Sequence, residues 1–139
     1  KTIVKNKRII LIDDSLVRGT TCHKIVKMLY ESGAKEVHVR IACPEIKYPD
    51  FYGVDMPTKK ELLAHEKNNQ EMCDYIKAKS LKFLSLNGLY KALISEKRNN
   101  IYPQFSDHYF TGDYPIKPDD NIRGLKVKQL SLLSGKSNF

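Results

Sequence analysis

Two adjacent carboxylates and a nearby glycine predict a site for a phosphorylated sugar. Asp13 and Asp14 follow a short apolar run, and Gly19 stands just before a helical pattern. Carboxylates repel phosphate, but they suit vicinal sugar hydroxyls or a hard cation such as Mg2+. Glycine lets a ligand approach the main chain, and the first amides of a helix bind phosphate because they have no partner inside the helix. The segment therefore fits a ligand with hydroxyls at one end and phosphate at the other.

The polar residues around Gly19 strengthen this interpretation. Thr20 and Thr21 add hydroxyl donors, and Arg18 adds a cation. A simpler alternative is that the acids cap a turn and that the glycine only allows the chain to change direction there. Acidic turns are common, but the whole run from Asp13 to Thr21 favours the binding site.

An α/β arrangement must position these residues. The apolar run Ile9–Ile12 predicts a buried parallel strand. Residues Thr20 to Ser32 carry a helical stripe of apolar side chains, which Gly33 ends as a C-cap. Residues Glu36 to Cys43 are rich in β-branched side chains and predict a second strand. Strand, helix and strand form a right-handed unit, so the sheet is expected to be parallel.

The connection Pro44–Pro57 follows the second strand, where ligands of open α/β sheets bind. Tyr52, Asp55 and Pro57 are therefore expected to line or close the site, or else to stiffen a long loop. After this connection, a helix is expected to follow the capping box Thr58–Glu61, and a second helix is expected to be capped by Asn68 or Asn69. A strand is expected at Leu81–Leu84, and then a helix at Leu86–Glu96 with Leu89, Leu93 and Ile94 pointing inward. A polar arm, Lys97–Pro118, and a C-terminal helix from Asp119 through Leu133 are expected to complete the chain.

Composition limits the class of protein. The chain has 139 residues, a formal net charge of +8 and 41% hydrophobic residues. One domain is expected, and no apolar run is long enough to cross a membrane. The lysines are scattered, which predicts a solvated surface and no nucleic-acid partner. The three cysteines form no CxxC pair, so buried thiols in a reducing cytoplasm are expected.

A receiver domain of two-component signalling also begins with a strand that ends in two aspartates. Such a domain needs a third Asp at the tip of a later strand. The next strand here ends in Cys43-Pro44, with no Asp at its tip. This pattern argues against the signalling class.

The segment LIDDSLVRGTT closely resembles the phosphoribosyl pyrophosphate (PRPP) loop of type I phosphoribosyltransferases. Its VRGTT variant is similar to that of the amidophosphoribosyltransferases. The segments Pro44–Pro57, Glu61–His65 and Phe110–Pro115 resemble the same family in the same order. The resemblance implies a partial type I phosphoribosyltransferase fold of the α/β class over residues 1–139, with a parallel sheet, flanking helices and a C-terminal helical arm.

The resemblance also implies a reaction, the first step of purine synthesis. Ammonia released from glutamine displaces pyrophosphate from PRPP, with Mg2+, and gives phosphoribosylamine. Asp13 and Asp14 would hold the ribose hydroxyls and serve the Mg2+ shell. The expected binding residues for PRPP or a nucleotide are Asp13, Asp14, Ser15, Val17, Arg18, Gly19, Thr20 and Thr21.

Other features of the family are not expected here. Its N-terminal glutaminase domain and two further substrate loops precede the PRPP loop, so the chain is expected to be a single incomplete domain without activity of its own. Some relatives carry an iron–sulfur cluster, but Asp50, Ser106 and Asp107 stand around the positions of its cysteines, so no cluster is expected. The expected ligands are PRPP or purine nucleoside monophosphates. A homo-oligomer, a separate glutaminase-bearing chain and a non-catalytic nucleotide-binding module remain open.

Overall fold

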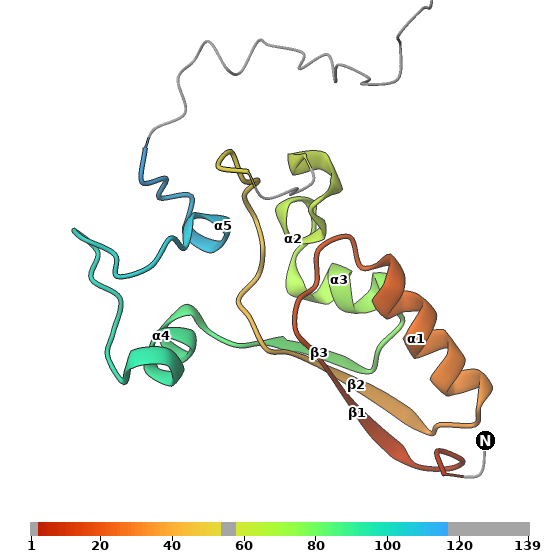
Figure 1. Ribbon diagram of the computed structural model, residues 1–139. Helices are drawn as coiled ribbons and strands as arrows, with labels where there is room; N and C mark the ends of the chain where they lie inside the picture. The colour runs from red at the N-terminus through yellow and green to blue at the C-terminus, as the bar shows by residue number, and fades with distance from the viewer. Residues whose placement is uncertain (1–2, 54–57, 117–139) are drawn as a thin grey trace, which may run out of the picture.

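The computed structural model describes residues 3–53 and 58–116, which build a three-stranded parallel sheet with flanking helices (Figure 1). The strands, in their order across the sheet, are β1 (Arg8–Asp13), β2 (Glu36–Ile41) and β3 (Ser80–Phe83). The helices are α1 (Thr20–Glu31), the short 3-10 helix η1 (Lys59–Glu61), α2 (Leu63–Glu66), α3 (Asn69–Tyr75), α4 (Leu86–Ile94) and α5 (His108–Thr111). The predicted α/β class and parallel sheet are confirmed.

Local signals in the sequence set most of these boundaries. Gly33 ends α1 with a φ of 91°, and its amide donates to the carbonyl of Tyr30 at 2.8 Å. Asn68 caps α3 through its side chain, and Ser85 caps α4 in the same way. Such caps satisfy amides that have no partner inside the helix. They involve residues within a few positions of each other, which is why the sequence predicts them.

The core lies between the sheet and the helices on one of its faces. The strand register places Leu11, Val39 and Leu81 side by side on that face. Val26 of α1 and Met72 of α3 pack in the same cluster and are almost fully buried. Each buried aliphatic side chain contributes roughly 1.5–3 kcal/mol. This packing holds α1 against the sheet and so supports the turn between β1 and α1.

The opposite face of β1 differs from the prediction of a buried strand. Ile10 is 65% exposed and Ile12 is 73% exposed. Within the described residues, β1 is an edge strand with a partner on one side only. Figure 1 shows α1 and α3 on the other face of the sheet. A continuous apolar run therefore did not distinguish a central strand from an edge strand.

Three further expectations changed or fall outside the described residues. Leu93, predicted to point inward from α4, is 59% exposed, whereas Tyr90 is 1% exposed and fills the core side. The short helix α5 interrupts the predicted polar arm. Asp55, Pro57 and the predicted C-terminal helix lie outside the described ranges. Among the helices of the described ranges, none has the length and apolar character needed to cross a membrane.

Candidate functional site

A cavity of about 310 Å3 lies at the turn between β1 and α1. Its lining is the continuous stretch of residues 13–22, so all the predicted binding residues meet at one hollow. Leu16 also belongs to the lining and is 2% exposed, which anchors the turn in the core. Acids from a strand end and amides from a helix start therefore face one space. This arrangement can hold a ligand with hydroxyls at one end and an anion at the other.

The two carboxylates are joined to the turn through one oxygen each. The amide of Asp14 donates to Asp13 Oδ1 at 3.1 Å, and the hydroxyl of Ser15 donates to Asp14 Oδ1 at 3.1 Å. These bonds orient both side chains and leave a second oxygen on each. Among the described residues, no group of three or more His, Cys, Asp or Glu side chains has metal-ligand geometry. The free oxygens of Asp13 and Asp14 are of the type that hard cations such as Mg2+ prefer as ligands.

Gly19 is the residue on which the shape of the turn depends. Its φ is 74°, in the left-handed region, and it occupies the N-cap position of α1. A Cβ at this position would lie 2.8 Å from Leu63 Cδ2 and 3.1 Å from Tyr75 Cε1. Gly19 has no side chain to bind the first amides of α1, so these amides can bind a ligand.

Arg18 has a partner that the sequence did not predict. Its Nε and Nη2 lie 3.2 and 3.1 Å from Oε1 of Glu61, which is 43 residues away along the chain. The hydrogen bond from Arg18, together with those from Thr58, lowers the pKa of the Glu61 carboxyl below its usual value. The predicted phosphate cation is thus paired with a carboxylate in this structure.

Two cysteines lie close to the predicted site. Burial, with a smaller contribution from the charge of Asp13, raises the pKa of Cys22 to about 11. Burial and the charge of Asp14 raise the pKa of Cys43 to about 11 as well. All three cysteines of the chain are free thiols. Neither Cys22 nor Cys43 can be an effective nucleophile near neutral pH, because the reactive form is the thiolate.

This chemistry predicts slow alkylation. We expect iodoacetamide to label the native chain at pH 7.5 at least about tenfold more slowly than the urea-unfolded chain, since a thiol of pKa near 11 is almost entirely protonated. Mass spectrometry after timed quenching measures the rate at each cysteine. Raising the pH toward 10 should accelerate labelling of the native chain. Fast labelling of Cys43 at pH 7.5 would contradict this expectation.

A second polar cluster ties the loop after β2 to α5. Nε2 of His108 lies 2.8 Å from Asp50 Oδ1, and its Nδ1 lies 2.9 Å from the hydroxyl of Ser106. The ring of Tyr52 packs edge-on against His108, with centroids 5.2 Å apart. Tyr52 is therefore not part of the cavity lining. For Tyr52, the structure favours the interpretation in which an aromatic residue stiffens the loop, whereas Asp55 and Pro57 lie outside the described residues.

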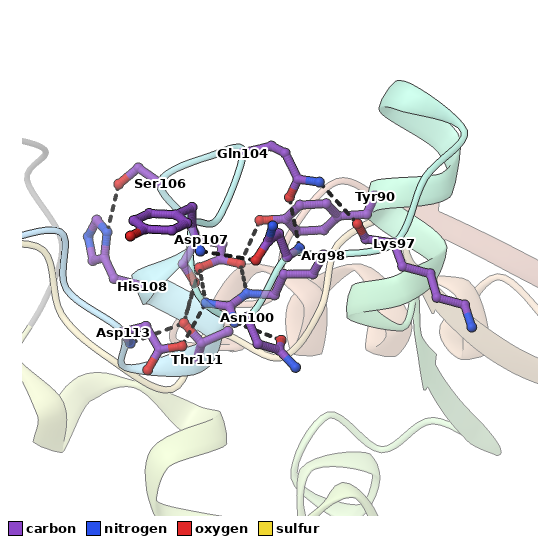
Figure 2. A network of polar contacts seen from close by, with 12 residues as sticks. Tyr90, Lys97, Arg98, Asn100, Gln104, Ser106, Asp107, His108, Thr111 and Asp113 are labelled. Carbon is purple, nitrogen blue, oxygen red and sulfur yellow. Dashed lines mark hydrogen bonds and ion pairs between the residues drawn. The ribbon is translucent and has the colours of Figure 1, made fainter.

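The arm before α5 is held by a buried guanidinium (Figure 2). Arg98 donates to both oxygens of Asp107 and to Asp113, and the Tyr90 hydroxyl donates to Asp107 at 2.8 Å. Burial opposes ionisation of Asp107, but the bonds from Arg98 and Tyr90 and the charge of Arg98 outweigh it. The pKa of the Asp107 carboxyl therefore lies below its usual value.

Sequence reasoning missed three residues that contact the residues lining the cavity. Glu61 pairs with Arg18, while Leu63 and Tyr75 pack against Gly19. The capping box assigned Glu61 a local role, which the structure retains. Nothing in the local sequence pattern showed that the segment after the capping box would contact the turn between β1 and α1.

Comparison with known proteins relates this chain to the amidophosphoribosyltransferases. No protein-family model matches the chain. The amidophosphoribosyltransferase of Rhizobium etli is 51% identical over 135 residues, which are 96% of this chain and 27% of that protein. The enzyme of Staphylococcus aureus (strain N315) is 51% identical over 83% of this chain and 23% of its own length. The chloroplastic amidophosphoribosyltransferase 2 of Arabidopsis thaliana is 46% identical over 91% of this chain and 21% of its own length.

Solved structures give the same result. The glutamine PRPP amidotransferase from B. subtilis, complexed with ADP and GMP, superimposes with a TM-score of 0.74 at 43% identity, covering 82% of this chain and 25% of that one. A structure described as the allosteric regulatory enzyme of purine biosynthesis gives a TM-score of 0.68 at 42% identity, covering 82% and 24%. The chain thus spans about a quarter of the length of the relatives that it matches. In sequence and in fold, it is related over its own length to one segment of the amidophosphoribosyltransferases.

Proposed function

We propose that the turn between β1 and α1 binds the ribose 5-phosphate part of PRPP, as one portion of an amidophosphoribosyltransferase. The observation that carries this proposal is the single cavity lined by residues 13–22, in which Asp13 and Asp14 lie at one end of the turn and Gly19 begins α1 at the other. The amides of residues 19–21 and the hydroxyls of Thr20 and Thr21 would hold the phosphate. The carboxylates would accept hydrogen bonds from the ribose hydroxyls.

The proposed reaction is a displacement at the sugar. A nitrogen atom of ammonia forms a bond to C1 of the ribose, the C1–oxygen bond to pyrophosphate breaks, and the nitrogen loses a proton. Bound Mg2+ would neutralise charge on the leaving pyrophosphate. Asp13 and Asp14 would hold the ring in position and stabilise positive charge that develops on it. The contribution of this turn is positioning and electrostatics, with no covalent step on the protein.

A second candidate function uses the same cavity without chemistry. A purine nucleoside monophosphate shares its ribose and 5′-phosphate with PRPP. The B. subtilis neighbour was solved with ADP and GMP, which supports nucleotide binding as a property of this fold. The chain would then act as a ribonucleotide-binding or regulatory module.

Calorimetry tests both candidates with PRPP, GMP and AMP, each with and without Mg2+. Replacing Asp14 with asparagine is expected to weaken binding about tenfold or more, because a hydrogen bond to a charged acceptor contributes about 1.5–3 kcal/mol. Glu31→Gln is the matched control, since Glu31 is an exposed acid at the far end of α1. The control should bind as the original chain does.

The outcomes separate the candidates. Mg2+-dependent binding of PRPP supports the enzymatic function, and binding of GMP or AMP alone supports the module. The chain is expected to give no phosphoribosylamine from PRPP, Mg2+ and ammonia, and turnover in that assay would contradict this part of the proposal. No binding of any of the three ligands, or equal binding by Asp14→Asn, would contradict the assignment of the site.

A further inference from the structure

The turn that lines the cavity is held by contacts with residues 58–63, which lie 40 residues or more further along the chain. Oε1 of Glu61 accepts from both Nε and Nη2 of Arg18, at 3.2 and 3.1 Å. Its other oxygen, Oε2, accepts from the amide and the hydroxyl of Thr58, at 3.2 and 3.1 Å. Both oxygens of Glu61 are therefore used, one on the turn and one on its own helix start.

The same segment also contacts the turn through its main chain. The amide of Leu63 donates to the carbonyl of Val17 at 2.9 Å. The Leu63 side chain fills the space beside Gly19, where a Cβ would lie only 2.8 Å from it. Contacts on both sides of Arg18 thus hold the backbone of residues 17–19. The ion pair between Arg18 and Glu61 is the one of these contacts that involves charged side chains.

We infer that Glu61 is a positioning residue, and that its pair with Arg18 holds the turn in the conformation that presents its amides to phosphate. This inference rests on the proposed function, since it assigns phosphate binding to the main chain of residues 17–21. It reverses the role that the sequence suggested for Arg18. The guanidinium directs two donors at Glu61, so it braces the turn, and the phosphate is bound by amides and threonine hydroxyls.

The competing arrangement makes the opposite prediction. If Arg18 bound the phosphate itself, Glu61 would compete with the ligand for the guanidinium. Removing the charge of Glu61 would then strengthen binding, whereas removing a brace weakens it. The sign of the change therefore decides between the two roles.

Three variants test the brace by titration with GMP: Arg18→Gln, Glu61→Gln, and the double variant with both changes. Glutamine at 61 keeps the capping box, which accepts Glu or Gln, so this change removes only the ion pair. Because the pair is solvent-exposed, each single change is expected to weaken binding about two- to fivefold. The double variant should be no weaker than either single one, because both changes remove the same ion pair.

Lys27→Gln is the control, because Lys27 forms another exposed ion pair of α1, with Glu31. It should leave GMP binding unchanged. Tighter binding by Glu61→Gln, or additive losses in the double variant, would each overturn the brace.

A second measurement needs no ligand. Hydrogen exchange of the amides of residues 17–20 in the free chain is expected to be faster in both single variants and no faster still in the double variant. If the original chain binds none of the sugar phosphates, the proposed function fails, and the exchange data still decide whether the pair braces the turn. Unchanged exchange in Arg18→Gln and Glu61→Gln would overturn the inference.

Discussion

Replacing Arg98 with methionine is expected to lower the free energy of unfolding by about 3–5 kcal/mol, the usual cost of leaving a buried charge without its partner. The Arg98 side chain is 7% exposed and that of Asp107 is 4% exposed. Methionine keeps most of the apolar volume but removes the two donors that Arg98 directs at Asp107. The hydroxyls of Tyr90 and Thr111 would remain as partners, but neither carries the positive charge that a buried carboxylate needs (Figure 2). Urea unfolding followed by circular dichroism measures the change.

Two controls belong to this experiment. Lys97→Met changes an exposed neighbouring cation and should alter stability by less than about 0.5 kcal/mol. Asp113→Asn removes the outer partner of Arg98, whose side chain is 60% exposed, and should cost no more than about 1 kcal/mol. A loss in Arg98→Met as small as that in Lys97→Met would show that the cluster does not stabilise the fold.

The same cluster predicts a dependence of stability on pH. The pKa of Asp107 is lower in the folded chain than in the unfolded chain, where a free aspartate titrates near about 3.9. The unfolded state therefore takes up the proton first as the pH falls. The contribution of Asp107 is fully present above the unfolded pKa and is lost as the pH falls through the folded value. Arg98→Met should lose this acid-side slope.

Replacing Gly19 with alanine is expected to weaken GMP or PRPP binding by more than about tenfold and to destabilise the fold by about 1–3 kcal/mol. A left-handed conformation costs a residue with a Cβ roughly 1–2 kcal/mol. The new Cβ would also lie 2.8 Å from Leu63 Cδ2 and 3.1 Å from Tyr75 Cε1, so the turn must shift. A shifted turn no longer directs its amides at one phosphate. Calorimetry and urea unfolding measure the two effects.

Gly53 supplies the matched control. Its φ is 108°, but a Cβ there would meet nothing within 4 Å. Gly53→Ala therefore introduces backbone strain without the clash, and it should leave ligand binding unchanged. The double variant Gly19→Ala/Leu63→Ala relieves the closest contact and should recover part of the binding. Equal binding by Gly19→Ala and Gly53→Ala would contradict the close approach of the ligand to this turn.

Some features of the chain follow from its sequence because they depend on near neighbours. The apolar run Ile9–Ile12 predicts the strand that the structure has as Arg8–Asp13. Apolar periodicity and glycine placement predict the helix that begins after Gly19 and its end near Gly33. The caps at Asn68 and Ser85 need only a side-chain oxygen and an amide three residues later. The predicted binding residues also share one turn, so the sequence alone brings them together.

Only the tertiary structure decided what surrounds that turn. Arg18 meets Glu61, and Gly19 meets Leu63 and Tyr75, because α2 and α3 pack behind α1 on one face of the sheet. The exposure of Ile12 likewise depends on the position of β1 at the sheet edge, which its apolar run cannot express. Interactions between residues close in sequence determine where a segment turns and how its helices are capped. Contacts across 40 residues or more depend on strand order and helix packing, which no local pattern encodes.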